Sequence, residues 1–300
     1  MQHLSEIVEE ARRRGKKRLA VAYGQDTHTI EAVYEAYKEN LVEAILYGDR
    51  MVITEACHSL NIDPSVFNII DEKVDTKCVS LAVAAVVSGE ADILMKGLVS
   101  TDKYMRGILN KEAGLFPPKG TLSHVSVFEW PGYHKLLLAS DIAVIPLPDF
   151  KQKTILIGYL GQVAKLLGIK TPKIGCVAPS ELVLPSVISS TEAAILSKMA
   201  SRGQLGDVEV DGPLSLDVSL FKNVAQHKKV KGSSIAGDVD ALLFPNLESA
   251  NVFFKSVSHL AGGELAAMVM GTKVPCILTS RGDSALSKKY SIALACLAAK

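Results

Sequence analysis

Apolar runs of strand length alternate with segments of helical periodicity along the whole chain, and this alternation constrains the fold most strongly. Residues 27–41 and 75–90, for example, carry apolar side chains at helical spacing. The runs that predict strands are 18–24, 43–48, 67–71, 91–97, 122–129, 135–146, 173–181, 207–214, 241–246 and 275–280. Strand–helix alternation of this kind predicts an α/β protein with mainly parallel sheets that helices cover on both faces.

The length of the chain indicates two domains or one large one. Its 300 residues are 48% apolar, enough for a substantial core. Proline, glycine and aromatic residues gather near 130–150, where we expect a domain junction. The apolar helix predicted from about residue 284 needs a packing partner, which we expect in the first domain. We therefore expect a discontinuous first α/β domain, residues 1–138 plus 283–300, and a second α/β domain, residues 139–282.

Charge and composition argue against several classes of protein. Lys plus Arg (33) nearly balance Asp plus Glu (32), so no overall field favours nucleic acid or a membrane surface. The N-terminal stretch lacks a signal-peptide core, and no apolar run approaches the length of a membrane span. We expect a cytoplasmic protein that binds neither nucleic acid nor membrane.

Cysteine and histidine usage predicts neither a disulfide framework nor a metal site. Five widely spaced cysteines are expected to be reduced thiols. No Cys-x-x-Cys, His-Glu-x-x-His or other paired spacing typical of zinc occurs, so no metal is predicted.

Ligands of open α/β sheets bind beyond the carboxyl ends of the strands, so the residues just after each strand are the first candidates for a binding site. One predicted strand runs into a segment that combines charge, glycine and hydroxyls before a helix: Lys96, Gly97, Ser100, Thr101 and, within the helix, Arg106. Backbone N–H groups at a glycine and a helix start, together with a lysine, suit phosphate. The alternative is a turn glycine, an N-cap hydroxyl and two solvated cations.

The last predicted strand ends in Thr279, Ser280, Arg281, Gly282 and Asp283. Hydroxyls, a guanidinium and a carboxylate just before a helix can hold and act on an anion. They are also compatible with ordinary helix-start chemistry.

Four further residues are candidates for substrate binding. Ser123 and His124 begin a strand-like run, where the histidine is either a base near neutral pH or a hydrogen-bonded structural residue. Asp211 belongs to an Asp-Gly-Pro turn and Asn246 comes after an apolar strand, so each either lines a cleft or shapes a turn or cap.

Standard phosphate and nucleophile motifs are missing. No Gly-x-Gly-x-x-Gly comes after the first strand, and neither a Walker loop nor a Gly-x-Ser-x-Gly elbow occurs. If phosphate is handled here, it is not by an ATPase-type loop.

The segments "MKGLVST", "VDGPLSLD", "DVDALLFPNLESANVFFKS" and "LTSRGDSALSKKYSIALA", in this order, resemble the phosphate acetyl/butyryltransferase family. Over roughly residues 10–300 the chain is more similar to the butyryltransferase branch than to the phosphotransacetylases. The resemblance implies two α/β domains of the isocitrate/isopropylmalate dehydrogenase type with an interdomain cleft, in a homo-oligomer. It also implies the reaction of acyl-CoA with phosphate to give acyl phosphate and free CoA, with coenzyme A as a substrate and no bound cofactor.

Carried over by residue, the resemblance makes Ser280 and Arg281 the active-site pair. Ser100, Thr101 and Arg106 then match the family's phosphate-side segment. The phosphotransacetylases carry an aspartate seven residues beyond the serine as base for the CoA thiol, where this chain has Ser287. Asp283 is the nearest carboxylate, and we expect it to be the base.

Two other functions are compatible with the same fold. One is a metal- and NAD-dependent decarboxylating dehydrogenase, which needs several aspartates converging on a divalent metal. The other is a phosphate- or CoA-binding protein without turnover. Between acetyl and butyryl substrates the sequence leaves the choice open.

Overall fold

The structure, a computed structural model, describes residues 1–280 and 282–300. Its chain divides into two compact units. We call residues 4–122 with 265–300 the 4–122 unit, and residues 1–3 with 123–264 the 123–264 unit.

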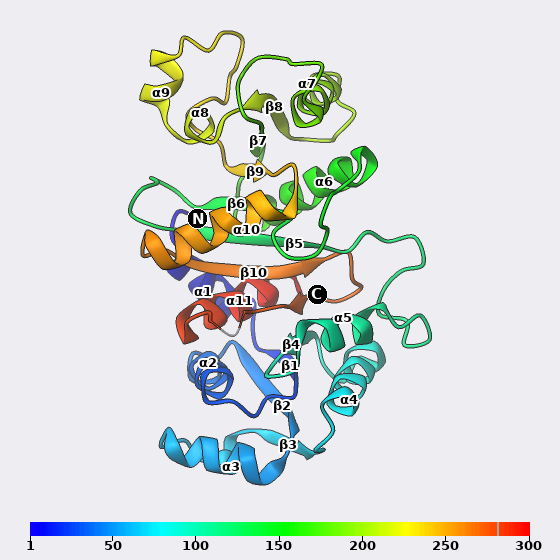
Figure 1. Ribbon diagram of the computed structural model, residues 1–300. Helices are drawn as coiled ribbons and strands as arrows, with labels where there is room; N and C mark the ends of the chain where they lie inside the picture. The colour runs from blue at the N-terminus through cyan, green and yellow to red at the C-terminus, as the bar shows by residue number, and fades with distance from the viewer. Residues whose placement is uncertain (281) are drawn as a thin grey trace. The chain divides into compact units, whose positions relative to one another are not determined.

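The 4–122 unit alternates strands and helices, as the periodicity predicts (Figure 1). Its elements are α1 (Leu4–Arg13), β1 (Lys17–Ala22), α2 (Thr27–Lys38), β2 (Val42–Gly48), α3 (Arg50–Ser59), a 3-10 turn (Pro64–Val66), β3 (Asn68–Asp71), α4 (Asp75–Ser88), β4 (Ile93–Lys96), α5 (Thr101–Leu109), β10 (Glu264–Met270), β11 (Cys276–Ile277) and α11 (Ala285–Ala298). The strand order is β3-β2-β1-β4-β11-β10, and β10 alone runs antiparallel to its neighbour β11.

The 123–264 unit has the same kind of architecture. Its elements are β5 (Ser123–Glu129), β6 (Leu137–Ser140), α6 (Phe150–Leu166), β7 (Lys173–Val177), α7 (Ile188–Ser201), β8 (Glu209–Leu214), α8 (Leu216–Leu220), α9 (Lys222–His227), β9 (Ala241–Leu243), α10 (Leu247–Lys255) and a π-helical turn (Ser256–Leu260). The strand order is β5-β6-β9-β7-β8, with β5 antiparallel to β6 and the other pairs parallel.

The expected α/β class with mainly parallel strands is confirmed, and each predicted run contains a strand. The run 135–146 was predicted as one strand, but β6 ends at Ser140. The Asp141 carboxylate turns the chain there, because it accepts hydrogen bonds from the N–H groups of Ala143 and Val144 at 2.8 Å each. Strand β10 was missed, since its Ala- and Met-rich sequence favours a helix locally.

The compact units differ from the expected domains at both boundaries. Residues 123–138 belong with the later strands because β5 pairs with β6. Residues 265–282 return to the 4–122 unit, because β11 pairs with β4 and β10 with β11. Strand pairing, which local composition does not reveal, therefore decides both boundaries.

Helix α11 packs against α1 and α2, which gives its apolar run the partner it needs. Two serine hydroxyls bond it to the sheet: Leu265 N–H donates to Ser287 Oγ and Ala267 N–H to Ser291 Oγ, each at 3.0 Å.

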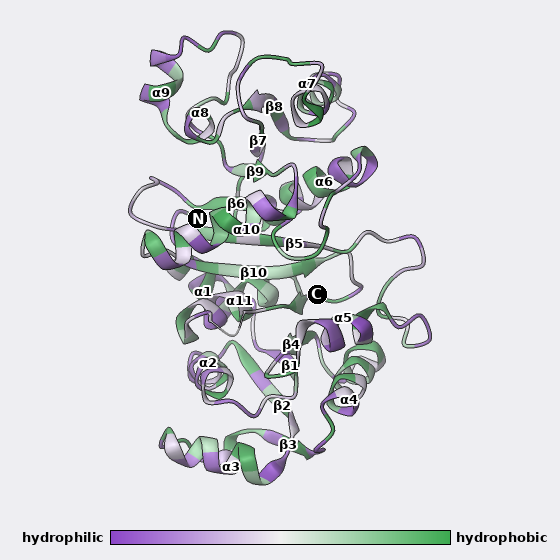
Figure 2. Cartoon of the chain, in the orientation of Figure 1, coloured by the Kyte–Doolittle hydropathy of each residue, from purple (hydrophilic) through white to green (hydrophobic). Residues whose placement is uncertain are grey.

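Figure 2 shows β10 largely hydrophobic, whereas α5 is largely hydrophilic. Among the described residues no helix is both long and apolar enough to span a membrane.

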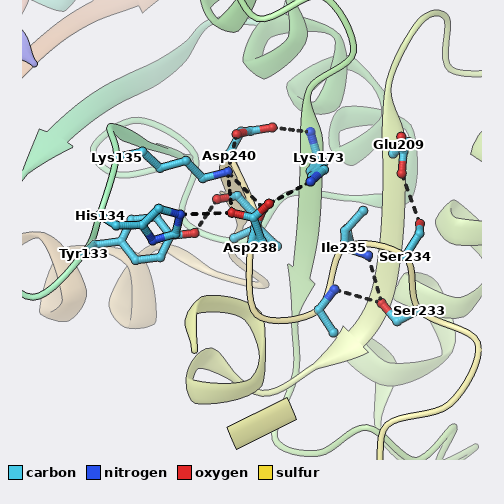
Figure 3. Close-up of polar contacts among 12 residues, drawn as sticks. Tyr133, His134, Lys135, Lys173, Glu209, Ser233, Ser234, Ile235, Asp238 and Asp240 are labelled. Carbon is cyan, nitrogen blue, oxygen red and sulfur yellow. Dashed lines mark hydrogen bonds and ion pairs between the residues drawn. The ribbon is translucent and has the colours of Figure 1, made fainter. Parts of the chain in front are cut away.

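Charged side chains join the amino ends of three strands in the 123–264 unit (Figure 3). Lys135 Nζ, just before β6, donates to Asp240 Oδ1 at 2.6 Å, and Lys173 Nζ, at the start of β7, donates to Asp238 Oδ2 at 2.7 Å. His134 Nε2 lies 3.1 Å from Asp238 Oδ1. Burial alone would raise the pKa of Asp238, but the hydrogen bonds from Lys173 and Lys135 outweigh it and lower that pKa.

Asp238→Asn is expected to destabilise the protein at neutral pH and progressively less as the pH falls below about 4. Because the folded-state pKa lies below the unfolded value of about 3.9, the carboxylate contributes fully above about pH 4 and progressively less below it. The side chain is 40% exposed, so water screening limits the effect to on the order of 1 kcal/mol. Calorimetric unfolding between pH 3 and 7 measures it, with Asp207→Asn, an exposed partner of Lys165, as control. An equal loss at every pH would contradict the assignment.

Candidate active site

Three parallel strands of the 4–122 unit, β1, β4 and β11, end at the same edge of the sheet. Ala22 lies opposite Lys96, and Met95 lies opposite Ile277. The segments just after these strands are therefore neighbours, as the carboxyl-edge rule requires. Lys96 and Ser280, far apart in sequence, come to one edge.

Lys96 is buried at this edge, with 3% of its surface exposed. Its Nζ donates to the Gly97 carbonyl at 3.1 Å. A desolvated ammonium is costly unless polar or anionic groups compensate it. The solvated alternative thus fails for Lys96, and phosphate binding by Lys96 stays a prediction.

Gly97 is required by a close backbone approach. A Cβ at this position would lie 2.4 Å from the Tyr23 carbonyl oxygen and 2.9 Å from Gly24 Cα, both backbone atoms. The loops after β1 and β4 therefore touch, and no side chain fits between them.

Gly97→Ala is expected to separate these two loops and cost about 1 to 3 kcal/mol, because overpacked sites strain the backbone. Denaturant unfolding measures the loss, and turnover should fall with it. Gly158→Ala in α6 is the matched control, since a Cβ there meets no atom within 4 Å. A Gly97→Ala variant as stable as Gly158→Ala would refute the close-packing argument.

The start of α5 supplies the other predicted residues of this segment. Ser100 is the N-cap, its Oγ accepting from Lys103 N–H at 3.4 Å, and Thr101 is the exposed first helical residue. Arg106 forms an exposed ion pair with Asp102 at 3.0 Å. The capping alternative therefore describes Ser100, and phosphate binding by Thr101 and Arg106 stays a prediction.

The turn after β11 is closed by its own polar groups. Asp283 Oδ2 accepts from Ser280 N–H at 2.7 Å, and Asp283 N–H donates to the Ser280 carbonyl at 3.3 Å. Gly282 N–H donates to Ser280 Oγ at 3.3 Å. Arg281, predicted as the phosphate-orienting cation, lies outside the described residues.

Three residues at the start of α11, just after this turn, make distinct contacts. Ser284, not Asp283, is the N-cap of α11. Ser287, where phosphotransacetylases carry their aspartate, is buried and bonded to Leu265 N–H. Lys288, which the sequence did not single out, is buried beside the turn and donates to the Asp283 carbonyl. Its only sequence signal is a charge at a helix position where the pattern is otherwise apolar.

In the 123–264 unit, the antiparallel pairing of β5 and β6 brings Ser123 and His124 to the carboxyl end of β6. Ser123 Oγ lies 3.0 Å from Ser140 Oγ, and both residues are fully buried. His124, also buried, donates its N–H to Asp141 Oδ2 at 3.3 Å. Asp141 was missed because the predicted strand ran through it.

Asn246 reaches the same edge, but Asp211 does not. Phe244 N–H donates to the Ser140 carbonyl at 3.0 Å, which places the end of β9 beside β6, and Asn246 caps α10 by accepting from Ser249 N–H at 2.9 Å. Asp211 lies within β8, and its Oδ1 accepts from Ser197 Oγ at 3.1 Å. The Asp211 carboxylate is thus held by Ser197 of α7, and substrate binding by Asp211 stays a prediction.

All five cysteines are unpaired and buried, and burial raises the pKa of Cys176 and Cys276 to about 12. Over residues 1–280 and 282–300, no three His, Cys, Asp or Glu side chains gather as a metal would require.

Comparison with known proteins identifies the family. The protein-family model described as phosphate acetyl/butaryl transferase matches this chain in two overlapping segments, residues 3–81 and 72–296. The phosphate butyryltransferase of Clostridium beijerinckii is 43% identical over 283 residues, 94% of this chain and 93% of its own. The phosphate acetyltransferase of Thermotoga maritima is 41% identical over 291 residues, 97% of this chain and 98% of its own.

A solved structure supports the same relationship. The branched-chain phosphotransacylase from Enterococcus faecalis superposes with a TM-score of 0.83 at 26% identity, over 95% of this chain and 100% of that one. Both the sequence and the fold thus match over nearly the full length. This chain belongs to the phosphate acetyl/butyryl transferase family.

Proposed function

We propose that this protein is a phosphate acyltransferase that interconverts a short-chain acyl-CoA and phosphate with the acyl phosphate and free CoA. The single observation that carries the proposal is the 43% identity to a phosphate butyryltransferase over 94% of the chain. The grouping of Lys96 and the Ser280–Asp283 turn at one sheet edge supports it, because the reaction needs cationic and hydrogen-bonding groups around an anion.

The proposed chemistry is direct transfer in a ternary complex. In the direction of acyl phosphate formation, a phosphate oxygen attacks the thioester carbonyl carbon, the C–O bond forms, and the C–S bond breaks. The sulfur leaves with the electron pair and takes up a proton. Holding both substrates together provides much of the rate, so no covalent enzyme intermediate is needed.

Three residues of the turn have a role in this scheme. Arg281 orients the phosphate dianion through paired N–H donors. Ser280 donates a hydrogen bond to the carbonyl oxygen or the sulfur as negative charge develops. Asp283 exchanges the proton with the thiol, whose ordinary pKa of about 8.5 leaves little thiolate at neutral pH.

We further propose that the buried Lys96, with Gly97, Ser100, Thr101 and Arg106, binds the phosphate side of the substrates. Contacts from four residues of the 123–264 unit stay predictions: Ser123, His124, Asp211 and Asn246. The isocitrate/isopropylmalate dehydrogenase-like cleft, the homo-oligomer and the cytoplasmic location also remain predictions from the resemblance and composition.

Release of free thiol from acyl-CoA, measured spectrophotometrically, tests the proposal. Acetyl-CoA and butyryl-CoA are compared at equal phosphate, and we expect phosphate-dependent release with at least one of them. Arsenate should replace phosphate and drive the release to completion, because acyl arsenates hydrolyse. A protein that binds CoA without releasing thiol under either condition would be a binder and not this enzyme.

Activity is expected to survive exhaustive chelation, because the proposed chemistry is positioning and hydrogen bonding and the described residues form no metal-ligand group. Thiol release before and after dialysis against EDTA measures this. A loss that magnesium or manganese restores would favour the metal- and NAD-dependent dehydrogenase alternative, which an assay with NAD would then test.

A further inference from the structure

Lys288 is a buried lysine in the second turn of α11 with 3% of its surface exposed. Two effects disfavour a cation there: burial removes its hydration, and the amino end of a helix is the positive end of the helix dipole. An unbranched apolar side chain such as methionine would fit the same place without the cost of desolvating a charge. The presence of a lysine at this buried position is therefore explained by the groups with which its ammonium interacts.

Lys288 holds the turn that carries the active-site residues. Helical side chains lean toward the helix amino end, and Lys288 Nζ accordingly reaches back to donate to the Asp283 carbonyl at 2.6 Å. The Asp283 carboxylate in turn accepts from Ser280 N–H at 2.7 Å. Asp283 is thus fixed through its backbone by Lys288 and through its side chain by Ser280.

The charges around Lys288 come from two loops at the same sheet edge. Burial lowers the pKa of Lys288, while Asp283 and Asp26 act in the opposite direction. Asp26 is the N-cap of α2 in the loop after β1. Its Oδ1 accepts from Thr29 N–H, whereas its Oδ2 is buried with no hydrogen-bond partner among the described residues. The ammonium is therefore compensated by the loops after β11 and β1.

We propose that Lys288 is a positioning residue for acyl transfer. Its hydrogen bond to the Asp283 carbonyl holds the backbone of the Ser280–Asp283 turn, so that Ser280 and Asp283 keep the geometry that acyl transfer needs. The inference rests on the proposed function for its kinetic consequences. It goes beyond that function by assigning a role to a helix residue outside the turn.

Lys288→Met tests the proposal against Lys289→Met as a matched control. Lys289 is the next residue of α11, and its Nζ forms an ion pair with Glu39 Oε1 at 2.7 Å; over residues 1–280 and 282–300 its side chain has no hydrogen bond to the turn. We expect Lys288→Met to lower kcat at least about tenfold, the effect of losing one charge-assisted hydrogen bond. The Michaelis constant for butyryl-CoA should change less than about threefold, because a transition-state interaction is lost. Lys289→Met should leave both constants within about twofold of the wild type.

A double-mutant cycle with Ser280→Ala separates positioning from a general loss of active protein. If Lys288 acts through the turn, Lys288→Met should lower kcat by less than about threefold in the Ser280→Ala background, because residues that act as a unit are non-additive. Multiplicative losses would mean that Lys288 acts independently of Ser280 and would overturn the proposal. If Lys288→Met does not fold, Lys288→Leu, which also removes the donor, takes its place in the cycle.

Hydrogen exchange distinguishes failure of this inference from failure of the proposed function. The amides of 280–284 should exchange faster in Lys288→Met than in the wild type or in Lys289→Met, whether or not the protein turns over. A wild type without thiol release refutes the proposed function alone. Unchanged exchange in the turn refutes the role of Lys288.

Discussion

Arg281→Ala is expected to raise the Michaelis constant for phosphate and to lower turnover by at least about tenfold. A hydrogen bond to a charged group contributes about 1.5 to 3 kcal/mol, and each 1.4 kcal/mol is about tenfold in rate. The planar guanidinium can bind two phosphate oxygens at once, which a lysine cannot do, so Arg281→Lys should recover only part of the loss.

The measurement is thiol release over a range of phosphate concentrations at saturating acyl-CoA. Arg202→Ala serves as a control, since Arg202 is an exposed residue at the carboxyl end of α7. An Arg281→Ala enzyme with unchanged phosphate dependence would remove Arg281 from the phosphate site.

Asp283→Asn is expected to lower turnover at least about 100-fold and to abolish the acidic limb of the pH–rate profile, if Asp283 is the thiol base. The change isolates the proton-transfer role, because an asparagine oxygen can still accept from Ser280 N–H as Asp283 Oδ2 does at 2.7 Å. The Lys288 contact uses the backbone carbonyl of Asp283, which the substitution does not alter.

The competing account makes Asp283 a helix-capping carboxylate, and it predicts a loss of roughly 1 kcal/mol of stability with the acidic limb retained. The N-cap of α11 is Ser284, whose side chain accepts from Ser287 N–H at 2.9 Å, so we expect little loss of stability. Unfolding experiments on Asp283→Asn, run beside the rate profiles, decide between the accounts. A retained acidic limb would move the search for the base to His124 and Asp211.

Local sequence was sufficient for much of the fold and for part of the site. The apolar runs located the strands that end at Lys96 and just before Ser280, because an apolar run bounded by polar and turn residues is a local property. The local sequence also identified the polar segments that come just after these strands. Residue types alone indicated what those segments can do, since lysine, serine and carboxylate have fixed chemical capacities.

Sequence could not tell capping from ligand binding at individual residues. Ser100 and Asn246 cap helices and Asp211 bonds to Ser197, while their contacts with substrate stay predictions. A hydroxyl or carboxylate has the same local signature in either role, because both use the same acceptor atoms.

The sequence by itself determined the α/β class, most strand positions and the family motifs, because these depend on neighbours along the chain. Only the tertiary structure decided that β4 and β11 lie side by side, that residues 265–280 belong with the first strands, and that Lys288, not Lys289, is the lysine beneath the Ser280–Asp283 turn. Strand order and side-chain burial arise from contacts between residues far apart in sequence, and adjacent lysines on one helix differ only in which neighbours the fold brings to them.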